Sequence, residues 1–259
     1  MKKQITIFIL IILQISCFAT KQETDILILN KDTLYLDNSP LEDLSDVCIE
    51  LQSHEKVLNS GCWNGFVAEW IIVENTLYLK NIYSYSTKEN INKRLEKILK
   101  TKFENKKLKA EWFTGSFFGG FGRYLANGSF NVYEKERLFQ FEKGILKKVI
   151  EYNAENIEYS MNENVVEEFV YKNFNWSIVD TTKYLHQEIL VFAQSDFTGK
   201  LKEIKFENSS GNSIIEVEIE RILKLIPDWG KYYWNGQKFE FYKDYKFIIS
   251  NEHMKKYAR

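Results

Sequence analysis

Short apolar runs separated by turn-forming residues are the feature that most constrains the fold of this chain. Phe66–Val73 and Thr76–Tyr85 are separated only by Glu74-Asn75, and Asp25–Leu29 and Thr33–Leu36 form a second closely spaced pair. Runs rich in β-branched and aromatic residues that are bounded by such turns predict antiparallel hairpins. The front of the chain is therefore expected to fold mainly into β-strands.

One helix is expected within this β-rich domain, which we place at residues 24–152. Ser86–Glu89 fits a capping box, and an apolar stripe at helical spacing follows it. The stripe consists of Ile91, Leu95, Ile98 and Leu99. Further along, Ser116–Tyr124 alternates glycines with large aromatic residues, and we expect these glycines to give the aromatics room in a bulged strand.

Composition excludes several classes of protein. With 44% hydrophobic and 15% aromatic residues, the chain can fill a real core and does not have the composition of a disordered protein. Its 35 Lys+Arg against 36 Asp+Glu leave no broad positive surface for nucleic acid. We expect no nucleic-acid partner.

The N-terminus predicts export. Lys2 and Lys3 precede an apolar run over Ile5–Ile15, and small residues follow, which is the pattern of a secretory signal peptide over residues 1–19. Cleavage after Ala19 would give a soluble exported protein. Alternatively, the sequence before Cys17 resembles a bacterial lipoprotein signal, in which case Cys17 carries the lipid and the protein meets the membrane only through that anchor. Both alternatives stay open.

Export makes the two remaining cysteines relevant. Cys48 and Cys62 lie close together in the sequence, and a disulfide between them is chemically allowed in an oxidising compartment. Such a bond would stabilise the fold by ~3 kcal/mol in the chain-entropy model. The alternative is two small buried thiols that pack as hydrophobic side chains.

The C-terminal quarter has a regular order of elements. After a connecting segment over residues 153–183, strands are expected at Glu188–Gln194 and Lys200–Phe206. An amphipathic helix follows and ends at Pro227, with Ile215, Ile219, Ile222 and Ile226 forming its apolar stripe. A long alternating run after Asn235-Gly236 predicts a last strand.

This strand–strand–helix–strand order over residues 184–259 resembles the C-terminal domain of TonB, the periplasmic energy-transducing protein. The matching phrases are Gly199, Glu203–Phe206 with Ser209–Gly211, Ile226–Trp229 and Asn235–Lys238. The resemblance covers about a quarter of the chain. The expected fold class is therefore α+β, with an antiparallel β-rich domain followed by a small β-β-α-β domain of the TonB C-terminal type.

The resemblance implies a function in protein–protein contact. In that family the domain binds the extended N-terminal segment of outer-membrane receptors by adding a strand to its sheet, because a sheet edge carries unpaired N–H and C=O groups. The candidate edge is the last strand, within Lys238–Ile249. Its partner-binding residues are predicted to be Phe239, Phe241, Tyr242, Lys243, Tyr245 and Phe247.

The chain also departs from TonB. A force-transmitting TonB has a long Pro-rich spacer, whereas this chain has 2 Pro and a β-rich domain in the corresponding place. Parts of that domain, including Asp32–Glu42 and Cys62–Trp70, resemble exported proteins of Gram-negative bacteria, which implies no function. We therefore expect contact with an envelope protein in the periplasm, with a TonB-dependent outer-membrane receptor as one candidate.

No constellation of residues predicts catalysis. The 3 His have no metal-ligand spacing, and Gly120–Leu125 lacks the third small residue of a dinucleotide fingerprint. We expect no enzyme activity, no cofactor and no metal. The alternative function is a ligand- or glycan-binding front domain, less plausibly a hydrolytic one, in which Trp63, Trp70 and Trp112 stack on a sugar and the C-terminal module serves as a tether.

Overall fold

Hairpins joined by tight turns build the first part of the molecule. The computed structural model describes residues 23–55, 61–125, 131–179, 186–207 and 213–258. The fold is α+β and mostly strand, as expected. The strands of the first part are β1 (Ile26–Leu29), β2 (Asp32–Leu36), β3 (Phe66–Val73), β4 (Thr76–Ser84), β5 (Leu108–Lys109), β6 (Gly115–Tyr124), β7 (Tyr133–Glu142) and β8 (Ile145–Asn153).

These strands form one sheet that closes on itself. Its order is β3-β1-β2-β6-β7-β8-β4-β5, and β3 also pairs with β4, which completes the circuit. All the pairings are antiparallel except that of β1 with β3. The shortest ladder in this circuit joins β4 to β8 and consists of the single residue pair Thr76–Ile145. Beside it, Leu77 N–H donates to Gly144 O at 2.8 Å and Leu146 N–H donates to Asn75 O at 2.7 Å.

Turn residues fix two of the hairpins. Glu74 and Asn75 both have positive φ, as do Lys143 and Gly144, and two successive positive φ values are typical of the type I′ turns that match strand twist. Glycine is needed at 144 for a second reason, because a Cβ atom there would lie 2.5 Å from the Ala110 carbonyl oxygen. The hairpin predicted around Glu74-Asn75 is confirmed.

Two helices pack on this sheet, whereas the sequence predicts one. Helix α2 (Ser45–Ser53) buries Cys48 and Leu51, and α3 (Asn92–Leu99) buries Leu95. The predicted capping box does not start α3. Instead Thr87 Oγ1 accepts a hydrogen bond from Glu89 N–H within the preceding loop, and the helix begins after Ile91, which contributes no side-chain cap.

Of the glycines in β6, Gly120 makes room for an aromatic ring, as predicted, whereas Gly119 makes room for Leu34. A Cβ atom on Gly120 would overlap the ring of Tyr133 on the neighbouring strand β7. The register of β6 against β7 shifts between Phe121 and Tyr124. The interior of the sheet is filled by apolar side chains that include Leu34, Trp70, Phe117 and Phe139.

The second part places helices on a small sheet. Strands β9 (His186–Ser195), β10 (Leu201–Phe206) and β13 (Phe241–Ser250) pair antiparallel in the order β10-β9-β13. Its helices are α4 (Glu158–Met161), α5 (Glu163–Asn173), α6 (Ser213–Leu223) and α7 (Asn251–Tyr257), with a 3₁₀ turn at Trp176–Ile178.

Helix α6 ends at Leu223 and not at Pro227 as predicted, so Ile226 lies beyond it. The apolar stripe predicted for this helix is nevertheless buried over its whole length. It shares one core with Val191 and Phe247 of the sheet and with Val166 and Val170 of α5. Residues 153–183, expected to be a connecting segment, thus supply a core helix to the second part. The rest of this core consists of the inward-facing side chains of β9 and β13, which alternate with outward-facing side chains along each strand.

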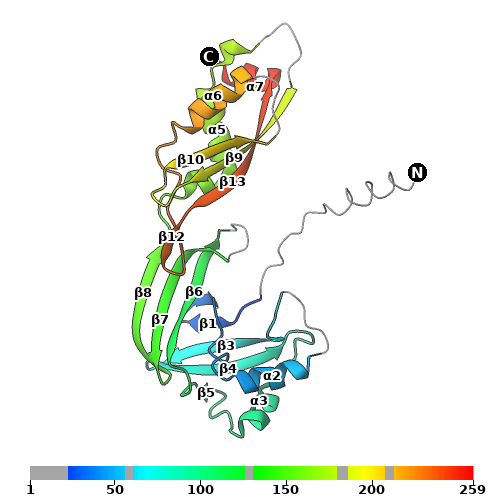
Figure 1. Ribbon diagram of the computed structural model, residues 1–259, viewed down its shortest axis with the longest axis vertical. Helices are drawn as coiled ribbons and strands as arrows, with labels where there is room; N and C mark the ends of the chain where they lie inside the picture. The colour runs from blue at the N-terminus through cyan, green and yellow to red at the C-terminus, as the bar shows by residue number, and fades with distance from the viewer. Residues whose placement is uncertain (1–22, 56–60, 126–130, 180–185, 208–212, 259) are drawn as a thin grey trace, which may run out of the picture.

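A hairpin joins the two parts, which lie end to end in Figure 1. Strands β11 (Tyr232–Trp234) and β12 (Gln237–Phe239) form this hairpin between α6 and β13. The single last strand expected from the sequence is thus divided, and Phe239 lies in β12. A small apolar cluster fills the junction and consists of Leu125, Val132, Ile157, Tyr232 and Phe241.

Candidate functional site

Strand β13 is one edge of the three-stranded sheet. Its ten residues pair with β9 over the register Phe241–Ser195 to Ser250–His186, and no strand of the described part of the chain pairs with its other side. Ile248 N–H points away from β9, because it donates to the hydroxyl of Tyr171 on α5 at 2.9 Å. Outward- and inward-facing backbone groups alternate along an antiparallel strand. The backbone groups of Tyr242, Asp244 and Lys246 therefore face outward as well.

The side chains predicted to bind a partner divide into two groups. Tyr245 and Phe247 are buried in the core of the second part, and Phe241 is buried in the junction cluster. All three side chains are therefore inaccessible to a partner at the edge. Tyr242 is 42% exposed and stacks on Phe192 of β9 with ring centroids 6.0 Å apart.

Lys243 pairs with Glu163 of α5 at 2.9 Å, which ties the edge strand to the helix layer. Among the predicted partner-binding residues of β13, Tyr242 is the one that combines an exposed side chain with backbone groups that face away from β9.

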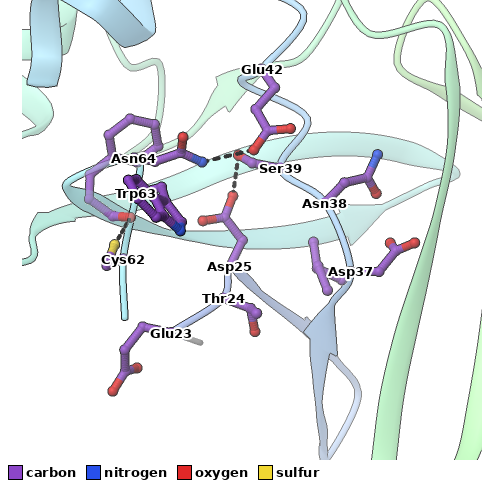
Figure 2. A pocket seen from close by; sticks show the side chains of 12 residues that line it. Glu23, Thr24, Asp25, Asp37, Asn38, Ser39, Glu42, Cys62, Trp63 and Asn64 are labelled. Atoms are coloured by element: carbon purple, nitrogen blue, oxygen red, sulfur yellow. Dashed lines mark hydrogen bonds between the residues drawn. The ribbon is translucent and has the colours of Figure 1, made fainter. Parts of the chain in front are cut away.

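A second candidate site is a cleft in the first part, built from two adjoining cavities of about 210 and 220 Å³. Both are lined by Thr24, Leu36 and Asp37, so they meet at the end of β2. Figure 2 shows the first cavity, with Trp63 and Asn64 on one side of Asp25 and Asp37 and Asn38 on the other. The second cavity extends to the β11–β12 hairpin, and its lining includes Phe118, Tyr133, Glu136, Trp234 and Asn235.

Asp25 is the buried carboxyl at the floor of the first cavity. Ser39 Oγ and Trp70 Nε1 donate to its Oδ2 at 2.5 and 2.9 Å, and Ala68 N–H donates to Oδ1 at 2.8 Å. Burial raises the pKa of Asp25 to about 6, although these hydrogen bonds oppose the shift. Its hydrogen bonds tie the start of β1 to Ala68 and Trp70 of β3 and to Ser39 after β2.

Glu136 of β7 is the buried carboxyl of the second cavity. Asn235 N–H and Gly236 N–H, at the turn of the β11–β12 hairpin, donate to it at 3.4 and 3.2 Å. Burial raises the pKa of Glu136 to about 7, and the nearby Asp37 adds to the shift. Burial also raises the pKa of Asp37 itself. Asp37 and Glu136 both line the second cavity, and the described lining of both cavities contains no lysine, arginine or histidine.

Of the tryptophans proposed to stack on a sugar, the structure brings only Trp63 to a cavity surface. Trp63 is 70% exposed. Trp70 is fully buried, and Trp112 packs edge-on against it with centroids 6.5 Å apart while donating to Pro40 O. Among the other aromatic residues of the cleft, Tyr35 and Trp234 come from segments far apart in the sequence.

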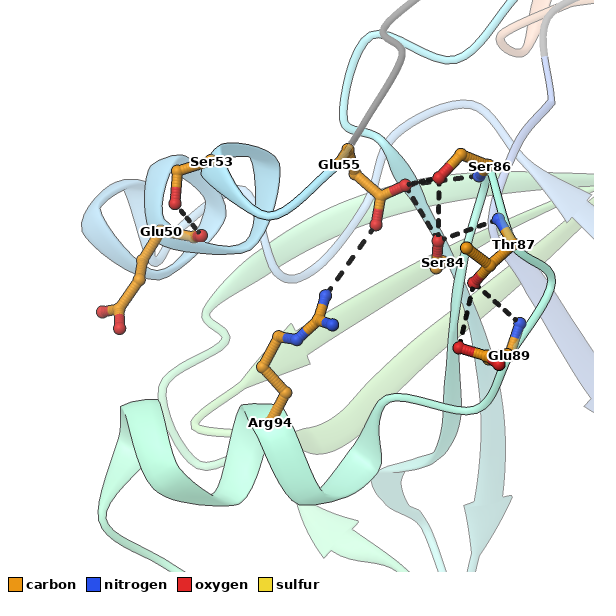
Figure 3. A network of polar contacts seen from close by, with 8 residues as sticks. All are labelled: Glu50, Ser53, Glu55, Ser84, Ser86, Thr87, Glu89 and Arg94. Atoms are coloured by element: carbon orange, nitrogen blue, oxygen red, sulfur yellow. Dashed lines mark hydrogen bonds and ion pairs between the residues drawn. The ribbon is translucent and has the colours of Figure 1, made fainter.

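A separate polar network holds α2 and α3 to β4, as Figure 3 shows. Glu55 accepts hydrogen bonds from Ser84 Oγ at 2.8 Å and Ser86 Oγ at 2.7 Å, and Arg94 Nη1 lies 4.0 Å away. Burial raises the pKa of Glu55, but these hydrogen bonds outweigh burial and leave it lowered. The hydrogen bonds tie the segment after α2 to the end of β4, whereas Arg94 Nη1 is buried without a hydrogen-bond partner among the described residues.

The cysteines are free thiols in this structure. Cys48 Sγ donates to Leu41 O at 3.2 Å, and Cys62 Sγ donates to Phe66 O at 3.3 Å. Burial raises the pKa of Cys48 to about 11, which makes it a poor nucleophile. Cys17 and the signal-peptide region lie outside the described residues.

Within the described residues no cluster of His, Cys, Asp or Glu could hold a metal ion. None of the helices there has the length and apolar character that crossing a membrane requires. Comparison with models of protein families, with curated proteins and with solved structures found no match.

Proposed function

We propose that this protein is a non-catalytic module of the cell envelope that binds an extended peptide along the edge of β13. The observation that carries the proposal is the direction of Ile248 N–H, because it sets the backbone groups of Tyr242, Asp244 and Lys246 facing away from β9. An incoming strand would satisfy these groups by main-chain hydrogen bonds.

The other edge of the same sheet is a weaker candidate. Strand β10 is shorter and has a register shift between Leu201 and Glu203. Irregular edges of this kind discourage strand addition. Strand β13 is regular over its whole pairing with β9. Tyr171 covers its far end, so the open stretch runs from Tyr242 to Lys246.

The sequence resemblance supports the same proposal. The second part has the order β9, β10, α6, β11, β12, β13. Apart from the β11–β12 hairpin, this order is similar to the β-β-α-β arrangement that the resemblance to TonB C-terminal domains implies, and it supports the proposal to that extent. We accordingly propose an exported protein that acts in the periplasm, either soluble or lipid-anchored. The proposed partner is an extended segment of an envelope protein, with the N-terminal segment of a TonB-dependent outer-membrane receptor as the first candidate.

A proline substitution at an outward-facing position tests strand addition. Asp244→Pro removes an outward N–H that the pairing with β9 does not use, so the fold should survive while the edge loses a donor. The control Asp244→Ala keeps that N–H. A photocrosslinking residue at Tyr242 reports binding in cells, and the same residue at Val217 of α6 reports background.

The expected result is capture of an envelope protein from position 242, through an extended segment, in the parent and in Asp244→Ala but not in Asp244→Pro. Circular dichroism confirms that each variant is folded. Equal capture by Asp244→Pro and Asp244→Ala would contradict strand addition. Capture of a receptor's N-terminal segment would identify the partner class that the resemblance implies.

A further inference from the structure

The cleft beside β2 has properties that peptide binding at β13 does not explain. Its two cavities share Thr24, Leu36 and Asp37 in their lining, and the second is also lined by Trp234 and Asn235 of the β11–β12 hairpin. Its two cavities, of about 210 and 220 Å³, together fall within the range of small-ligand sites. Both parts of the molecule therefore contribute to it.

Aromatic rings stand at both ends of the cleft. Trp63 lies at one end and is 70% exposed, although indole is among the side chains with most to gain from burial. At the other end Tyr35 lies flat on Tyr133, with centroids 5.3 Å apart and an interplanar angle of 4°, and Trp234 lines the same cavity. The electron-rich face of such a ring attracts the C–H groups of a flat, partly apolar ligand.

The polar groups between these rings narrow the ligand class. Four amides line the two cavities, and they are Asn38, Asn64, Asn131 and Asn235. Amides donate and accept hydrogen bonds, as hydroxyl groups do, whereas a cation would need acceptors alone. An anionic ligand is disfavoured, because the described lining has carboxyl groups and no basic side chain.

We propose that this cleft binds a neutral saccharide. In this arrangement Trp63 and the aromatic rings at the hairpin end stack on the C–H faces of sugar rings. The amides and the carboxyl of Asp37 hydrogen-bond to sugar hydroxyls. Because Trp234 and Asn235 belong to the hairpin, a bound saccharide also contacts both parts of the molecule.

Titration calorimetry and thermal shift on the full chain test the proposal, with cellotriose, maltotriose and triacetylchitotriose as probes at millimolar concentration. Trp63→Ala removes the exposed ring, and Trp63→Phe restores an aromatic face. Trp234→Ala tests the hairpin end. Phe197→Ala is the matched control, because Phe197 is an exposed aromatic residue at the β9–β10 turn, outside the cleft.

The expected result is that at least one saccharide binds and raises the melting temperature. Trp63→Ala and Trp234→Ala should weaken binding by about tenfold or more, equivalent to about 1.4 kcal/mol. Trp63→Phe should recover part of the loss, and Phe197→Ala should bind normally.

Three results would overturn the proposal. The first is that none of the three probes binds, and the second is that binding is unchanged in both tryptophan variants. The third is that spermidine binds the cleft and displaces the sugar, with equal dependence on Trp63. The last result would assign the cleft to organic cations. Capture of a peptide at Tyr242 is independent of all these outcomes, so failure here leaves strand addition intact.

Discussion

Replacing Glu136 by glutamine should change how the stability of the protein depends on pH. The side chain of Glu136 is buried and accepts two backbone hydrogen bonds from the β11–β12 turn. Its pKa is raised from 4.5 to about 7. The folded state therefore holds this proton more tightly than the unfolded state does, and stability is lost as the pH rises through this interval.

The size of the effect follows from the shift. Linkage at 1.36 kcal/mol per pKa unit gives a loss of roughly 2.5 kcal/mol between pH 5 and pH 8, most of it below pH 7. Glutamine is neutral throughout and has nearly the same shape. The free energy of unfolding of Glu136→Gln relative to the parent should therefore rise by roughly 2.5 kcal/mol from pH 5 to pH 8. Asp25 is present in both proteins, so its own titration cancels.

Urea titration of both proteins at each pH measures this difference. Glu151→Gln is the control, because Glu151 lies on the adjacent strand β8, is exposed and pairs with Arg137 at 2.7 Å. Its pKa is lowered, chiefly by the hydrogen bond from Arg137, so the control should show no gain at high pH. Parallel pH profiles for Glu136→Gln and the parent would refute the argument that burial of this carboxyl raises its pKa.

Further predictions concern the first part of the molecule. Gly120→Ala should destabilise it by about 1–3 kcal/mol in urea titrations, because the new methyl overlaps the Tyr133 ring; Gly115→Ala, where a Cβ atom has ordinary contacts, should be nearly neutral. Glu55→Gln should cost about 1–2 kcal/mol at pH 7. Its pKa is lowered, so that cost should shrink as the pH falls below 4.5, and an equal cost at low pH would contradict the network. Both described cysteines are free and buried, so dithiothreitol should leave the melting temperature unchanged.

Local sequence patterns predicted the elements whose signals are local. The hairpin at Glu74-Asn75 and the apolar stripe of α6 follow from turn chemistry and helical periodicity. Helix α2 was not predicted, although Leu44, Val47, Cys48 and Leu51 have helical spacing; its stripe is short and has no capping signal. The predicted start of α3 was wrong, because the residues of the apparent capping box belong to the loop before the helix.

The cleft could not be predicted, because its residues come from segments far apart in the sequence. Asp25, Asp37, Trp63, Glu136 and Trp234 each lie in a different run, and strand pairing brings these runs together. Residues 153–183 lacked a clear pattern for a related reason. Helix α5 buries a narrow face with Val166 and Val170 against a core supplied by later strands.

The single Thr76–Ile145 pair between β4 and β8 bears on how the first part opens. A closed sheet can open only where a ladder breaks, and this ladder has the least hydrogen bonding to lose. Native-state hydrogen exchange should therefore find the amides of Leu77 and Leu146 among the least protected in the sheet. Separation there would leave the long β6–β7 and β7–β8 ladders paired. The interior could then admit solvent briefly, at a free energy well below that of global unfolding, without disturbing the junction with the second part.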